Sequence, residues 1–191
     1  MRSVRRCFLA FLFLFSSIAQ AATDFYGTLL SGTYQPAESF AALSYDGSGT
    51  VYNFTLEAFD LDSIFTPGAF IGAIAVDADF QPTISNVTGD TVVSVAPGGG
   101  PGGGFDFRFD LTGPQQERLT ANETVSFTAT FSDPVVLSSS SFALHVQGLT
   151  EEQGGSAWYT PPAIPEPSTY AMLLAGLGLI GLLGRKRFTS N

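Results

Sequence analysis

Three segments of the chain alternate strictly between apolar and polar residues. Residues 105–111 place phenylalanine and leucine on one face and two aspartates and an arginine on the other. Residues 51–58 and 124–131 repeat this alternation, with aromatic and aliphatic residues opposite threonine, serine, asparagine and glutamate. Because successive side chains of a β-strand point to opposite faces, this period of two indicates strands with one buried and one solvent-facing side. The chain therefore predicts β-sheets rather than packed amphipathic helices.

Shorter strand candidates and turn sequences extend this pattern over the central part of the chain. Turn chemistry at Asp46–Gly49, Thr66–Gly68, Thr112–Pro114 and Ser132–Pro134 separates the candidates. We predict an all-β domain over residues 22–162, an antiparallel, jelly-roll-like β-sandwich whose strand order stays open. The glycine-rich run at 96–104 lacks the Gly-Lys-Ser/Thr of a phosphate-binding loop, so we predict a flexible hairpin or inter-strand loop there. The shorter candidates are residues 25–30, 70–76, 84–87, 91–95 and 142–146.

The N-terminal residues have the order of a secretory signal peptide. Three arginines within the first six residues precede an apolar run at 8–15, which is too short to cross a bilayer. Ala19-Gln20-Ala21 then provides the small-x-small spacing that signal peptidase accepts. We expect residues 1–21 to form a signal helix that is cleaved after Ala21, with Ala22 as the second choice. Cys7, the only cysteine, would leave with it, which excludes disulfides and thiolate sites from the mature protein.

A second apolar run lies near the C-terminus. Residues 168–184 carry no charge, and at ~1.5 Å rise per residue such a helix spans about 25 Å, enough for a thin bilayer. Arg185, Lys186 and Arg187 follow at once, and basic residues that flank a span stay on the cytoplasmic side. The run predicts a single transmembrane helix with the ectodomain outside.

A short proline-containing motif stands directly before this run: Pro165, Glu166, Pro167 and Ser168. Two prolines keep the segment extended and present it clear of the following helix. With the glycine-rich apolar helix and the basic tail, residues 163–188 resemble the PEP-CTERM sorting signal of exopolysaccharide-producing Gram-negative bacteria.

The resemblance implies a route through the cell envelope. It implies recognition by an exosortase, a membrane-embedded cysteine transpeptidase-like enzyme, with processing near Pro-Glu-Pro. The protein would cross the inner membrane once before processing and would then be attached or released at the cell surface or in the extracellular matrix. A plain stalk before a permanent single-span anchor is the alternative interpretation of the same residues.

The charge of the central region excludes one class of partner. Between residues 22 and 164 only Arg108 and Arg118 are basic, against sixteen acidic residues, which gives a net charge of −14. Nucleic-acid binding depends on lysine and arginine displacing the counterions of the phosphate backbone. We therefore exclude nucleic acid as a partner.

Residues suited to catalysis are scarce. His145 is the only histidine, no G-x-S-x-G elbow accompanies it, and we expect it on the more polar side of its strand. Lys186, the only lysine, lies behind the predicted span. We therefore predict no enzymatic activity. A secreted polysaccharide hydrolase is the alternative, since paired carboxylates could cleave glycosidic bonds if the fold brought them together.

Pairs of acidic residues are the main candidates for a metal site. Asp60, Asp62, Asp77 and Asp79 could hold Ca²⁺, which takes six to eight oxygen ligands. Solvated acids at strand edges are the alternative interpretation of these pairs. Arg108, which lies between Asp106 and Asp110, predicts exposed ion pairs of little energetic value.

Aromatic residues are the candidates for sugar binding. Trp158, Tyr159, Tyr34 and Tyr45 could stack on sugar rings, although packing in the core is the alternative for each. We predict an exported surface or matrix protein with a structural or polysaccharide-associating sandwich. Its partners would be the secretion machinery, an exosortase and exopolysaccharide.

Overall fold

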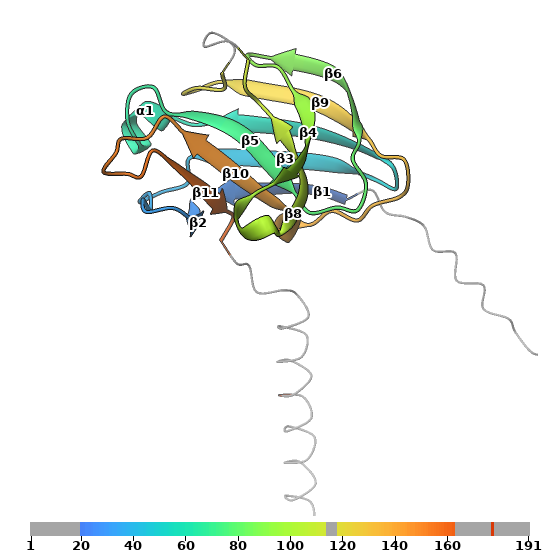
Figure 1. The fold of residues 1–191 in the computed structure, drawn as a ribbon. Helices are drawn as coiled ribbons and strands as arrows, with labels where there is room; N and C mark the ends of the chain where they lie inside the picture. The colour runs from blue at the N-terminus through green and yellow to red at the C-terminus, as the bar shows by residue number, and fades with distance from the viewer. Residues whose placement is uncertain (1–19, 114–117, 163–176, 178–191) are drawn as a thin grey trace, which may run out of the picture. The chain divides into compact units, whose positions relative to one another are not determined.

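The computed structural model describes residues 20–113 and 118–162, together with residue 177. Two antiparallel sheets pack face to face as a sandwich (Figure 1), which confirms the all-β prediction. The five-stranded sheet has the order β1 (Gln20–Tyr26), β3 (Ala41–Ser48), β4 (Val51–Ala58), β9 (Thr124–Thr130), β6 (Thr83–Gly89). The six-stranded sheet has the order β2 (Thr28–Ser31), β11 (Ser156–Thr160), β10 (Phe142–Gln147), β5 (Phe70–Val76), β8 (Phe105–Asp110), β7 (Ser94–Gly99). Short helical segments join strands in the described residues at α1 (Leu61–Ile64), Pro101–Gly103 and Ser139–Ser141.

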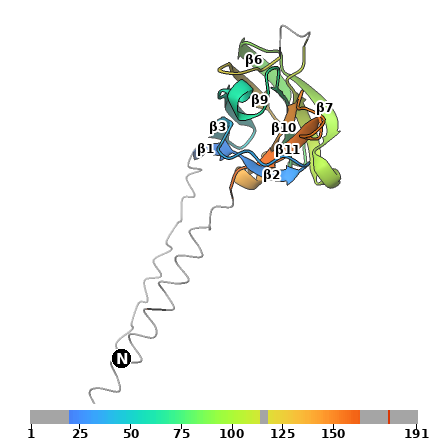
Figure 2. The same ribbon diagram turned by 90° about the vertical axis from the view of Figure 1, so that its left-hand side faces the viewer.

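Most connections cross from one sheet to the other. Consecutive strands pair within a sheet at β3–β4, β7–β8 and β10–β11, whereas the other consecutive strands lie in different sheets. Figure 2 separates the layers, with β1, β3, β9 and β6 on one side and β2, β11, β10 and β7 on the other. Both sheets therefore draw on strands from the whole length of the domain.

The strand predictions differ from the structure at several places. The candidate at 25–30 is divided at Gly27 between β1 and β2, which lie in different sheets. A Cβ at Gly27 would lie only 3.0 Å from the Ser39 Cα, so the chain needs glycine to change sheets here. The candidate at 91–95 overlaps β7 only at its last two residues. Residues 96–99 of the glycine-rich run complete β7, and residues 100–104 form the hairpin connection to β8. Strands β3 and β11 had no counterpart among the candidates.

Aromatic rings fill the space between the sheets. Phe54 of β4 is 1 % exposed, and its ring lies 5.1 Å from that of Phe127 and 5.6 Å from that of Phe109. It also meets the Phe142 ring edge-on at 5.8 Å, so it joins the two sheets directly. Burying a large apolar side chain stabilises a fold by ~1.5–3 kcal/mol, and each ring pair adds ~0.5–1.5 kcal/mol. This core explains how a domain without a disulfide holds together.

One edge strand turns a carboxylate inward. Asp24 of β1 is 4 % exposed, and its Oδ1 accepts a hydrogen bond of 2.7 Å from the Ser139 hydroxyl. Its Oδ2 and the hydroxyl of Tyr26 are buried without a hydrogen-bond partner in the described part of the chain. Burial, and then the Asp24 carboxylate, raise the pKa of Tyr26 and of Tyr45. An inward-pointing charge on an edge strand discourages pairing with another chain.

Two helices are predicted to flank the sandwich in the sequence. The signal helix at 1–21 and the transmembrane helix at 168–184 fall almost entirely outside the described residues. Gln20 and Ala21 belong to β1, where they pair with Gly47 and Asp46, so the expected cleavage site lies inside a strand. Within the described ranges, no helix is long and apolar enough to cross a membrane.

Candidate functional site

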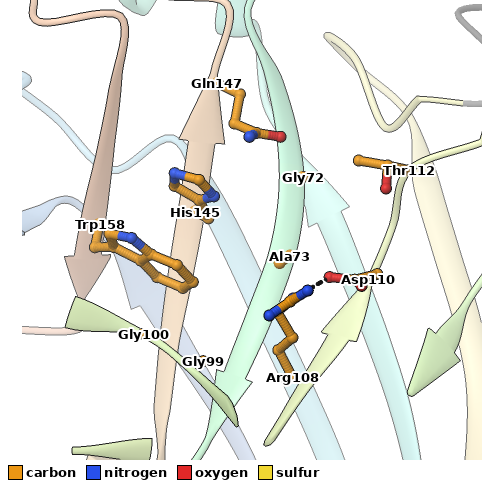
Figure 3. A pocket seen from close by; sticks show the side chains of 10 residues that line it. All are labelled: Gly72, Ala73, Gly99, Gly100, Arg108, Asp110, Thr112, His145, Gln147 and Trp158. Atoms are coloured by element: carbon orange, nitrogen blue, oxygen red, sulfur yellow. Dashed lines mark hydrogen bonds and ion pairs between the residues drawn. The ribbon is translucent and has the colours of Figure 1, made fainter. Parts of the chain in front are cut away.

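A trough of about 460 Å³ opens on the outer face of the six-stranded sheet (Figure 3). Gly72 and Ala73 of β5 form its floor, because the central strand carries very small residues where its neighbours carry large ones. The walls come from β10 and β11 on one side and from β8 and the end of β7 on the other. The lining residues are Gly72, Ala73, Gly99, Gly100, Arg108, Asp110, Thr112, His145, Gln147 and Trp158.

An aromatic pair forms one wall. His145 and Trp158 stand opposite each other in the β10–β11 ladder. Their rings are stacked almost parallel, with centroids 4.3 Å apart and an interplanar angle of 3°. Burial, and then the positive charge of Arg108, lower the pKa of His145 to about 4, with Asp110 acting weakly in the opposite direction. The imidazole is therefore neutral near pH 7, and the aromatic wall carries no charge.

An ion pair forms the opposite wall. Arg108 and Asp110 lie two residues apart on β8, so both side chains point to the outer face. The Arg108 Nε donates to Asp110 Oδ1 at 2.5 Å, and its Nη1 donates to the Gly98 carbonyl at 3.3 Å. In Figure 3 this pair lies across the floor from the aromatic wall. The two charges cancel each other, which leaves the remaining N–H groups of Arg108 as donors.

A β-bulge shapes the floor. In the β5–β10 ladder His145 pairs with Ala73 and Val146 pairs with Ile71, so Gly72 is an extra residue on β5. A Cβ at Gly72 would collide with the side-chain amide of Gln147, which therefore lies over the strand. Within the described part of the chain, no protein group hydrogen-bonds to the Gln147 amide or to the Trp158 indole N–H. Both remain available to a ligand.

The arrangement fits a molecule with one apolar face and several hydroxyls. The stacked rings offer a flat apolar surface, and Gln147, Arg108 and Thr112 place polar groups around it. Ligand sites of this kind combine aromatic contact area with a few polar groups that set orientation. A pyranose ring has these two properties, since its C–H groups form a flat face and its hydroxyls radiate from the edge.

The structure separates the four aromatic residues predicted as sugar-stacking candidates. Trp158 lies in the trough. Tyr45 and Tyr159 are 3 % and 0 % exposed in the core, and the Tyr159 hydroxyl donates to the Tyr34 carbonyl at 2.8 Å. Tyr34 is half-buried against Phe65, with its hydroxyl donating to the Ile64 carbonyl at 3.1 Å. For Tyr45 and Tyr159 the structure shows the alternative interpretation, packing in the core, and the Tyr34 hydroxyl is engaged by the Ile64 carbonyl.

The four aspartates considered for Ca²⁺ divide into two distant pairs. Asp60 caps α1 by accepting from the Ser63 N–H at 3.3 Å, and Asp62 accepts from the Gly68 N–H at 2.9 Å. Asp77 and Asp79 follow β5, whose length of seven residues places them ~20 Å from the other pair. Among the residues that the structure describes, no group of three or more acidic or histidine side chains gathers as a metal site.

Sequence reasoning did not find most of the trough. It placed His145 on the more polar side of its strand and treated the Arg108 ion pair as a surface feature. Gly72 and Gln147 carried no signal, because the bulge that brings them together depends on strand pairing across 75 residues. The alternation at 105–111 did show that Arg108 and Asp110 share a face.

Comparison with known families identifies the C-terminal segment. Residues 163–187 match the family model of the PEP-CTERM protein-sorting motif, which confirms the resemblance found in the sequence. Among curated proteins, none matches the chain. The motif implies an exported protein that an exosortase processes and sorts to the cell surface. Its predicted residues Pro165–Ser168 and Arg185–Arg187 lie outside the described part of the structure.

Proposed function

We propose that the protein is exported, processed at its sorting motif and held in the extracellular matrix by non-covalent binding of its sandwich to polysaccharide. The observation that carries the binding step is the stack of Trp158 on His145 beside a polar wall. The sorting motif supports a surface location, where polysaccharide is the abundant partner in exopolysaccharide-producing bacteria.

The trough supplies the two interactions that hold a sugar. The C–H face of a ring packs on the uncharged aromatic wall and removes apolar area from water. Hydroxyls at the edge of the ring accept from Arg108 and exchange hydrogen bonds with Gln147 and Thr112. Each such bond contributes ~0.5–1.5 kcal/mol net, so the trough binds one ring weakly.

We further propose that the trough binds polysaccharide without cleaving it. Glycoside hydrolysis generally uses two carboxyl groups on opposite sides of the bond, one as acid and one as base or nucleophile. Among the described lining residues Asp110 is the single carboxylate, and Arg108 holds it in an ion pair. Incubation of the protein with matrix polysaccharide should release no new reducing ends, and steady release would favour the hydrolase.

Retention on polysaccharide tests the binding step. The full-length chain in mild detergent should co-sediment with matrix polysaccharide from the producing cells, and Trp158→Ala should weaken this retention by about tenfold. Phe25→Ala is the control, because Phe25 is an aromatic residue that is 52 % exposed on a strand of the other sheet. Equal retention of Trp158→Ala and the wild type would contradict the proposal.

Cell fractionation tests the sorting step. The intact mass of the mature protein should show loss of the C-terminal segment in cells with the exosortase and its retention in cells without it. A full-length, membrane-bound species in both strains would instead favour a permanent single-span anchor.

A further inference from the structure

The charges that line the trough cancel. Among its described lining residues, Arg108 and Asp110 are the ones with a full charge near neutral pH, and they are joined to each other. His145 adds no positive charge there, because burial and the neighbouring guanidinium hold its pKa at about 4. A ligand therefore meets an electrically balanced surface.

The guanidinium of Arg108 is already engaged. A sugar carboxylate would bind it best through two parallel N–H···O bonds. The Nε donates to Asp110, so the side-on pair of Nε and Nη2 is closed to a carboxylate, and the Nη1 already donates to the Gly98 carbonyl. A carboxylate would also come close to Asp110 itself. A neutral hydroxyl can accept from the remaining N–H groups without disturbing the pair.

The negative charges around the trough also disfavour a carboxylated ligand. Asp106 lies on the same face of β8 as Arg108 and is exposed. The central region carries a net charge of −14, and at 0.1 M salt such charges act over ~10 Å. A polymer with a carboxylate on each sugar would be repelled before it reached the trough.

We propose that the trough selects neutral polysaccharide chains over carboxylated ones, and that Asp110 sets this preference by neutralising Arg108. The inference rests on the proposed polysaccharide binding and adds the charge class of the ligand. In this role Asp110 is a specificity-determining residue.

Matched pairs of polymers test the inference. A soluble glucan, a mannan and a galactan are each used before and after oxidation of their C6 alcohols to carboxylates, which changes the charge and preserves the backbone. The full-length chain in detergent is titrated with each polymer, and binding is followed by the fluorescence of Trp158, the only tryptophan in the chain. For any backbone that binds, we expect the oxidised form to bind at least about tenfold more weakly, and the difference to shrink at high salt.

Substitution of Asp110 tests its role. Asp110→Asn leaves the Arg108 guanidinium without a counter-ion. The ratio of the association constant for the oxidised polymer to that for the neutral polymer should therefore rise by about tenfold. Asp106→Asn is the matched control, because it removes the same charge from the same face of β8 outside the trough lining, and should leave the ratio nearly unchanged. Arg108→Gln is a second variant, which should lower the ratio because it leaves Asp110 unpaired.

The outcomes separate the two proposals. Equal or stronger binding of the oxidised polymers by the wild type would overturn the charge preference while polysaccharide binding stands. Binding of no polymer in either form would overturn both proposals. An equal change of the ratio of association constants in Asp110→Asn and Asp106→Asn would overturn the role of Asp110, since general charge repulsion would then account for the preference.

Discussion

Protonation of His145 should destabilise the fold as the pH falls from about 6.5 to about 4. The pKa of this histidine is lowered from 6.5 to about 4, first by burial against Trp158 and its neighbours and then by Arg108. Between these two values the unfolded chain binds a proton that the folded chain does not. Stability rises with pH wherever the unfolded state binds more protons. The contribution of His145 to the free energy of unfolding is therefore lost as the pH falls through this window.

The size of the effect follows from the shift. At about 1.36 kcal/mol per pKa unit the full shift corresponds to ~3 kcal/mol. The imidazole is partly exposed to solvent in the trough, which screens the interaction with Arg108. We therefore expect a loss of about 1–2 kcal/mol in the free energy of unfolding between pH 7 and pH 4.

Two measurements check this prediction. Urea unfolding of the wild type and of His145→Gln is measured at several values between pH 4 and 7. The difference between the two free energies of unfolding separates the contribution of His145 from that of the acidic residues. Because Trp158 is the only tryptophan and stacks on the imidazole, its fluorescence reports the protonation directly. A fluorescence midpoint near 6.5, or the same dependence on pH in both proteins, would refute the reasoning.

Three further predictions concern the core, the edge strand and the N-terminus. Phe54→Ala should lower the free energy of unfolding in urea by ~3–5 kcal/mol, because Phe54 contacts rings of both sheets, whereas Phe25→Ala should cost less than about 1 kcal/mol. Asp24→Asn should raise thermal stability by removing a buried charge with one unpaired oxygen, and Ser139→Ala should lower it; a decrease for Asp24→Asn would contradict this account. The mass of the secreted protein should place its first residue at Ala22 or Thr23, and a start upstream of Gln20 would contradict the predicted cleavage.

The local pattern of the chain specified the faces of its strands. The alternation at 51–58 and 124–131 correctly placed Phe54 and Phe127 in the core and threonines outside. This succeeds because side-chain direction in a strand has a period of two and needs no knowledge of neighbours. The sorting motif was recognisable for a similar reason, since its parts follow one another within 25 residues.

The pairing of strands was decided by the tertiary structure. Gly27 carries no pattern that marks a change of sheet, and β3 became visible only through its partners β1 and β4. Which of four aromatic residues would face solvent also depended on packing, which buried Tyr45 and Tyr159 and left Trp158 at the surface.

The candidate site was also decided by the tertiary structure. His145 and Trp158 stack because the register of β10 and β11 places them opposite each other. Arg108 lies on the far side of β5 from the two rings, because β8 and β10 pair with opposite edges of that strand. Sequence alone determined the alternation, the acidic charge and the C-terminal sorting motif, which are all local or additive properties. The trough needed the tertiary structure, because it is made of contacts between strands distant in the chain, and no local pattern encodes such contacts.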